Sequence, residues 1–150
     1  MAARGRRAAR TMAEHIGRQG VAPAVVLCST AKRARQTLEL IAPALGAPAV
    51  HIEDRIYAAS ADDLLDRLRL VPDAVPSVMV IGHNPSLQDL ACRLVKGSRS
   101  RALPRERFPT AALATLATAA AWNQLGPSGA ELVAYADPRG TAWRQRPLGG

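Results

Sequence analysis

Polar residues follow two apolar runs of this chain, at residues 28–37 and 82–85, and their types suit the binding of an anion. The first segment reads CSTAKRARQT and leads into an expected helix. Free N–H groups at a helix start favour an anion, and Arg33 in the first turn can bring its guanidinium fork to the same place. The second segment reads GHNP, and its His83 should be exposed directly after a strongly apolar run. A solvated arginine and a structural histidine are the alternatives at these two positions.

Short apolar runs alternate with amphipathic stretches along the chain. Strands are expected at 25–28, 49–52, 78–81, 113–118 and 131–136, and helices at 4–19, 31–44, 61–70 and 86–95. This alternation is typical of an α/β domain with a largely parallel sheet, to which the last two strands can add an antiparallel edge. Ligands of such sheets bind beyond the carboxyl ends of the strands. Arg33 and His83 are therefore predicted to lie at one edge of the sheet.

The composition is that of one globular domain. The chain has 150 residues, of which 48% are hydrophobic and 3% aromatic, so its core must be built from aliphatic side chains. No stretch has the roughly 20 apolar residues of a membrane span, and the N-terminus lacks the apolar run of a secretory signal. We expect a cytoplasmic protein with no membrane partner, a domain at residues 1–137, and a polar, frayed tail at residues 138–150.

Two cysteines, Cys28 and Cys92, lie far apart in the chain and in apolar surroundings. In a reducing cytoplasm they are expected to be buried free thiols, with a disulfide or a metal pair as the alternative. The spacing of Cys and His residues resembles no zinc site, so neither a metal nor another cofactor is expected.

The formal net charge is +8, and the positive residues concentrate in three segments. These segments are residues 4–18, 96–107 and 139–146. A basic surface suits nucleic acid, but no aromatic residues are interleaved for base stacking and no recognition motif follows. Attraction of an anionic, phosphorylated substrate explains the charge equally well.

Four segments together carry a resemblance to a known family. They read CSTAKRARQT, IYAAS, VIGHNPSLQDLA and RFPTAALATL. In order and spacing they are similar to the phosphohistidine phosphatases of the histidine phosphatase (phosphoglycerate mutase-like) superfamily, over residues 4–136. The resemblance implies a three-layer α/β/α fold with a mostly parallel sheet, and metal-free phosphoryl transfer through an enzyme phosphohistidine. It makes Arg33 a phosphate-binding residue, His83 the second catalytic histidine of the pocket, and Asn84 a residue that shapes the pocket. Residues 108–110 resemble a segment that supports the pocket rim.

The chain departs from this family at its start. Members begin with a strand ending in Arg-His, followed by Gly or Ala, and that histidine is the nucleophile. No Arg-His pair occurs in this chain. The first central strand is therefore expected to be missing, and the chain as given is expected to be inactive or nearly so.

Two interpretations of this departure compete. The chain is an incomplete product, such as one with a start codon assigned too far downstream, or it is a nucleophile-less relative that binds phosphorylated ligands. We favour the first, because loss of a central strand leaves unpaired backbone and exposed apolar faces. A basic nucleic-acid-binding domain is a further, less favoured alternative.

A second departure concerns the proton donor. Mutase-like and acid-phosphatase relatives place a glutamate after the second strand, where this chain has Tyr57. Glu53 and Asp54 are near but come a few residues early. Since a leaving imidazole needs a different proton supply from an alkoxide, this pattern favours phosphohistidine over sugar phosphates. The expected partner is a phosphorylated protein or a small phosphorylated substrate.

Overall fold

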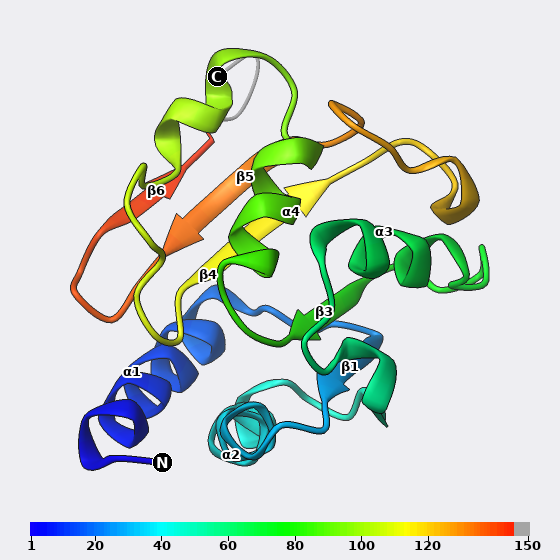
Figure 1. The fold of residues 1–150 in the computed structure, drawn as a ribbon. Coiled ribbons are helices and arrows are strands. Elements are labelled where there is room, and N and C mark those ends of the chain that lie inside the picture. Colours follow the sequence, from blue (N-terminus) through cyan, green and yellow to red (C-terminus); the bar gives the residue numbers. More distant parts are fainter. Residues whose placement is uncertain (146–150) are drawn as a thin grey trace.

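A computed structural model describes residues 1–145 of the chain, with the backbone alone for residues 98–100. Its strands form two separate three-stranded sheets (Figure 1). The first sheet is parallel, with the order β2-β1-β3, and consists of β1 (Val25–Ser29), β2 (Ala49–Glu53) and β3 (Val78–Ile81). The second is antiparallel, with the order β4-β5-β6, and consists of β4 (Leu113–Ala117), β5 (Glu131–Ala136) and β6 (Ala142–Arg144).

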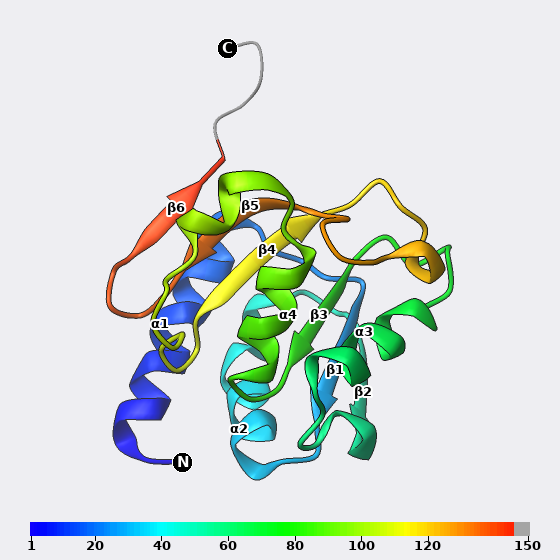
Figure 2. The ribbon, with the colours of Figure 1, turned by 45° about the horizontal axis from the view of Figure 1, so that its top comes forward.

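Helices cover both faces of the parallel sheet, which confirms the three-layer α/β/α architecture (Figures 1 and 2). On one face lie α1 (Ala3–Gln19) and α2 (Lys32–Ile41), and on the other lie α3 (Ala61–Arg69) and α4 (Ser86–Leu94). Side chains of β1 alternate between the two cores, as a strand requires. Val26 packs in the cluster of α1 and α2, whereas Leu27 packs in the cluster of α3 and α4.

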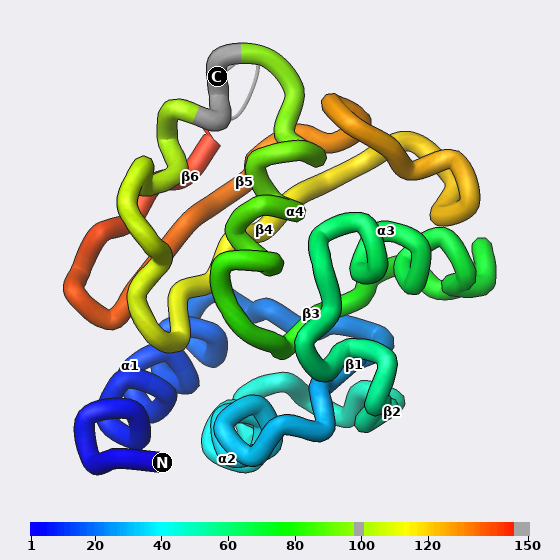
Figure 3. The backbone as a smooth tube through the Cα atoms, viewed as in Figure 1, coloured from blue at the N-terminus to red at the C-terminus, as the bar shows by residue number. Residues whose placement is uncertain are grey.

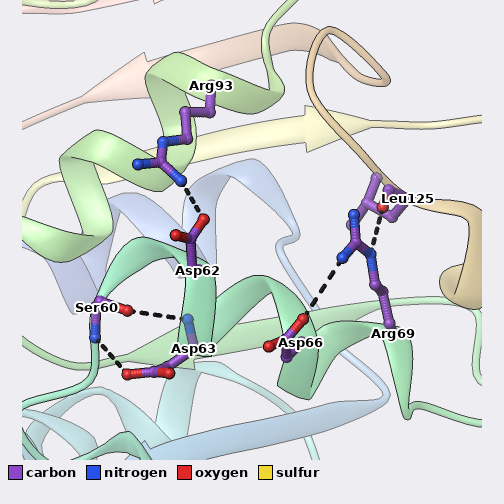
Figure 4. Close-up of polar contacts among 7 residues, drawn as sticks. All are labelled: Ser60, Asp62, Asp63, Asp66, Arg69, Arg93 and Leu125. Carbon is purple, nitrogen blue, oxygen red and sulfur yellow. Dashed lines mark hydrogen bonds and ion pairs between the residues drawn. The ribbon is translucent and has the colours of Figure 1, made fainter.

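Local sequence accounts for the ends of several elements. A capping box starts α3: the Ser60 hydroxyl accepts from the Asp63 N–H, and the Asp63 carboxylate accepts from the Ser60 N–H, both at 3.1 Å (Figure 4). Gly20, with φ +68°, ends α1 in the left-handed conformation that glycine adopts without strain. The predicted helix at 31–44 ends as an α-helix at Ile41 and continues as a 3₁₀ turn over Ala42–Ala44, which contains the proline.

Two expectations from the sequence are wrong. The tail after residue 137 is not frayed throughout, because β6 pairs with β5, and Tyr135 lies opposite Trp143. Residues 146–150 lie outside the described residues. Cys92 is exposed on α4 rather than buried, whereas Cys28 is buried in β1 as expected. The apolar neighbours of Cys92 in the sequence point to other faces of a helix, which a count of neighbouring residues cannot detect.

The two sheets are separate because β3 and β4 form no hydrogen-bonded pair with each other within residues 1–145. Pairing among residues 1–145 joins β3 only to β1 and β4 only to β5, and the chain between β3 and β4 passes through α4 (Figures 1 and 3). Leu113 and Leu116 of β4 still pack against the two cores of the parallel sheet. No residue of β4 is fully buried. Both strands therefore present an unpaired edge to the same region, an arrangement that proteins normally avoid.

No helix within the described residues is both long and apolar enough to cross a membrane.

Candidate active site

The segments after β1 and β3 leave the sheet side by side. The two strands are parallel neighbours, and Cys28 pairs with Ile81 at the end of the shared register. Arg33 stands in the first turn of α2, which follows β1, and His83 comes two residues after β3. Both side chains are exposed. The structure thus brings the two sequence-predicted site residues to one edge, because strand register fixes where each connecting segment begins.

The turn from β1 into α2 is tightly held. The buried Ser29 hydroxyl accepts the Ala31 N–H at 3.1 Å, and the Arg35 side chain donates to the Thr30 carbonyl at 3.0 Å. Helix α2 has no side-chain cap and no acidic residue in its first turn. Its leading N–H groups are left for an anion or solvent, beside Arg33. Cys28 is buried, and burial raises the pKa of its thiol to about 11, which disfavours the reactive thiolate.

His83 and Asn84 have different surroundings. The His83 Nε2 lies 3.4 Å from the hydroxyl of Ser86, which is buried at the start of α4. The Asn84 amide nitrogen donates to the Phe108 carbonyl at 3.1 Å, while its Oδ1 is buried with no hydrogen-bond partner among the described residues. Asn84 therefore ties the loop before β4 to the segment that follows β3. Its direct contact with substrate stays a prediction.

Gln88 holds the same loop from the next turn of α4. Its Oε1 accepts the Phe108 N–H at 2.8 Å, and its Nε2 donates to the carbonyls of Pro104 and Glu106 at 3.2 and 2.6 Å. Phe108 is buried and its ring packs against Tyr135 at 5.3 Å between centroids. Residues 104–108 are thereby fixed beside Asn84, and the supporting role expected for residues 108–110 stays a prediction. Sequence reasoning missed Ser86 and Gln88. Their spacing of three and five residues after His83 was the available signal.

Glu53 is committed to an ion pair and is not a free acid. Two hydrogen bonds join its carboxylate to the Arg67 guanidinium, at 2.7 and 2.9 Å, and both side chains are partly buried. The hydrogen bond from Arg67 holds the pKa of Glu53 below its ordinary value, against the opposing effect of burial. Glu53 therefore stays ionised near neutral pH and has no proton to donate. Tyr57, where relatives carry an acid, is 60% exposed.

Glu53→Gln should lower the free energy of unfolding at neutral pH by about 1–3 kcal/mol, because Arg67 loses its charged partner. A lowered pKa contributes stability above the ordinary value of 4.5 and loses it as pH falls further. The difference in unfolding free energy between the unmodified chain and Glu53→Gln should therefore decrease at acidic pH. Urea unfolding at several pH values measures it. The control Asp62→Asn breaks the exposed pair with Arg93 (Figure 4) and should cost under about 0.5 kcal/mol. Equal losses in the two variants would contradict this account.

Comparisons with known proteins agree with this fold. The family model of the histidine phosphatase superfamily (branch 1) matches residues 1–67. An uncharacterized protein of Mycobacterium tuberculosis is 40% identical over 123 residues, which cover 78% of this chain and 76% of the relative. One from Mycobacterium leprae is 36% identical over 117 residues, covering 76% and 71%.

Two solved structures share the fold over most of their length. A protein assigned as phosphohistidine phosphatase SixA from Nakamurella multipartitia is 31% identical, with a TM-score of 0.77, and the match covers 92% of this chain and 84% of that one. The protein histidine phosphatase SixA complexed with tungstate is 25% identical, with a TM-score of 0.74 and coverage of 93% and 84%. The chain belongs to the histidine phosphatase superfamily. Within that superfamily it is of the SixA type.

Proposed function

We propose that this chain provides the phosphate-binding part of a phosphohistidine phosphatase, in which Arg33 and His83 hold the transferring phosphoryl group. The observation that carries the proposal is their placement at one edge by adjacent parallel strands of a SixA-type fold. The SixA structure that contains tungstate, an oxyanion, gives further support. The proposed substrate is a phosphorylated protein. The alternative is a small phosphorylated compound that supplies the same phosphoryl group.

The chemistry requires two transfers. In the first, the phosphorus–nitrogen bond of the substrate phosphohistidine breaks as a histidine of the enzyme attacks the phosphorus. In the second, water attacks the phosphorus of the enzyme phosphohistidine, the phosphorus–nitrogen bond to the enzyme breaks, and inorganic phosphate and the free histidine result, with a water proton passing to the imidazole. The Arg33 guanidinium neutralises charge on the phosphoryl oxygens, and His83 hydrogen-bonds the same group. Because Glu53 is held by Arg67, an alkoxide leaving group would find no proton donor there. A phosphohistidine substrate fits this arrangement better than a sugar phosphate.

The nucleophilic histidine would come from a strand inserted between β3 and β4. Each of these two strands has one unpaired edge, so one more strand between them would join the two sheets. Helix α1 begins at the same edge as α2, where β1 and β3 end (Figure 2). A strand that precedes α1 and runs parallel to β3 would therefore deliver its last residues beside His83. We propose that an upstream Arg-His segment occupies this place, and that the chain as given does not turn over substrate.

The test compares this chain with one extended by the in-frame sequence upstream of Met1. Phosphate release from a phosphohistidine peptide should be at background for the given chain and about 10³-fold or more higher for the extended chain. An acid-labile phosphoenzyme should form only in the extended chain, and its thermal midpoint should be higher because β3 and β4 gain a partner. The control is the extended chain with its added histidine replaced by alanine.

Other outcomes would contradict particular parts of the proposal. Equal phosphate release by both chains would contradict an upstream nucleophile. An extended chain that binds tungstate without hydrolysing the peptide would favour a non-catalytic binder of phosphorylated ligands. An extended chain that does neither would contradict the phosphate site itself.

A further inference from the structure

The first turns of α1 and α2 are basic and contain no acid. We use the name basic face for the exposed cations Arg4, Arg6, Arg7 and Arg10 of α1 and Lys32 and Arg35 of α2. Within residues 1–38 the one acidic residue is Glu14. The ion pairs found in the described part of the chain use other cations. The charge of the basic face is therefore not balanced by the molecule itself.

This arrangement is unfavourable for the isolated protein. The N-terminus of a helix carries partial positive charge, so cations in the first turn repel it and acids stabilise it. Helix α3 follows the stabilising pattern, with Asp62 and Asp63 in its first turn. Helices α1 and α2 reverse it, and neither has a side-chain cap. An external anion would relieve the repulsion at both helices at once.

The basic face adjoins the proposed phosphate site. Helices α1 and α2 pack side by side and run in the same direction, so both begin at the edge where β1 and β3 end (Figures 1 and 2). Arg33 lies between Lys32 and Arg35 in the first turn of α2. A macromolecule that presents a phosphoryl group to Arg33 must therefore approach these cations.

We propose that the basic face docks an acidic surface of the phosphorylated protein, around its phosphohistidine. This inference rests on the proposed function and adds the surface and the charge of the partner. Complementary charge across such a contact speeds association and selects the partner. Nucleic acid fits less well, because α1 and α2 contain no aromatic residue on which a base could stack.

Peptides with a stable phosphohistidine analogue test the proposal on the chain as it is. One peptide has aspartates and glutamates on both sides of the analogue, and the other has serines and glycines. By fluorescence anisotropy at low salt, the acidic peptide should bind about tenfold more tightly than the neutral one, and added salt should reduce this preference. Arg7→Glu combined with Lys32→Glu should abolish it. As a control, Lys96→Glu reverses one charge beyond the far end of α4, where Lys96 faces Glu131, and should keep the preference.

The outcomes separate this inference from the proposed function. Equal binding of the two peptides, with both lost in Arg33→Ala, would overturn the docking surface and leave the phosphate site standing. If the acidic peptide binds with the same affinity whether or not it has its phosphoryl group, both the phosphorylated partner proposed here and the proposed function are contradicted. Tighter binding of a single-stranded DNA oligomer than of the acidic peptide would overturn the docking surface in favour of nucleic acid.

Discussion

Arg33→Ala should weaken tungstate binding by the upstream-extended chain by about 100-fold. A guanidinium fork gives two charge-assisted hydrogen bonds to one oxyanion, and losing them costs about 3 kcal/mol. Arg33 is placed for this by the β1–α2 turn, in which Ser29 and Arg35 fix the backbone on either side. Isothermal titration calorimetry with tungstate measures the dissociation constant directly.

Two further variants show whether the tungstate affinity depends on the geometry of the guanidinium or only on its charge. Arg33→Lys keeps the charge but loses the fork, and should weaken binding by about tenfold. Arg35→Ala removes a positive charge two residues from Arg33. Since the Arg35 side chain donates to the Thr30 carbonyl, its loss should weaken tungstate binding by less than about threefold. Similar losses in Arg33→Ala and Arg35→Ala would show that only the local field matters, and would contradict a direct contact.

Leu27→Ala should lower the free energy of unfolding by about 3–4 kcal/mol. Leu27 is 1% exposed in the central strand of the parallel sheet, and it packs in the cluster formed with α3 and α4. Truncation of the Leu27 side chain leaves a cavity under the strand ends from which the segments of Arg33 and His83 continue. Urea unfolding followed by circular dichroism measures the change.

Val50→Ala is the matched control for Leu27→Ala. Val50 lies on β2, which pairs with β1 on one side and has a free edge on the other, and its side chain is 45% exposed. The substitution should cost less than about 1 kcal/mol, since little apolar area is buried there. A loss equal to that of Leu27→Ala would mean that β2 is covered in solution.

Most elements of the fold could be predicted from local pattern. The run at residues 78–81 is a strand because it is short, apolar and followed by glycine, and Ser60 caps α3 because serine accepts from a free helix N–H. Burial was less predictable. Val50 and Ile52 lie in the predicted strand at 49–52, but that strand is at the edge of the sheet and both side chains are about half exposed. The position of a strand within a sheet depends on partners distant in the chain.

The amino-acid sequence by itself determined the α/β class, the superfamily resemblance and the two segments that hold Arg33 and His83. These follow from residue types and spacings within a few turns or strands. The tertiary structure decided that β1 and β3 are direct neighbours, that β3 and β4 do not pair with each other, and that Glu53 is held by Arg67. It also placed the loop at residues 104–108 against α4. Each of these depends on contacts between residues far apart in the sequence, which only the folded chain brings together.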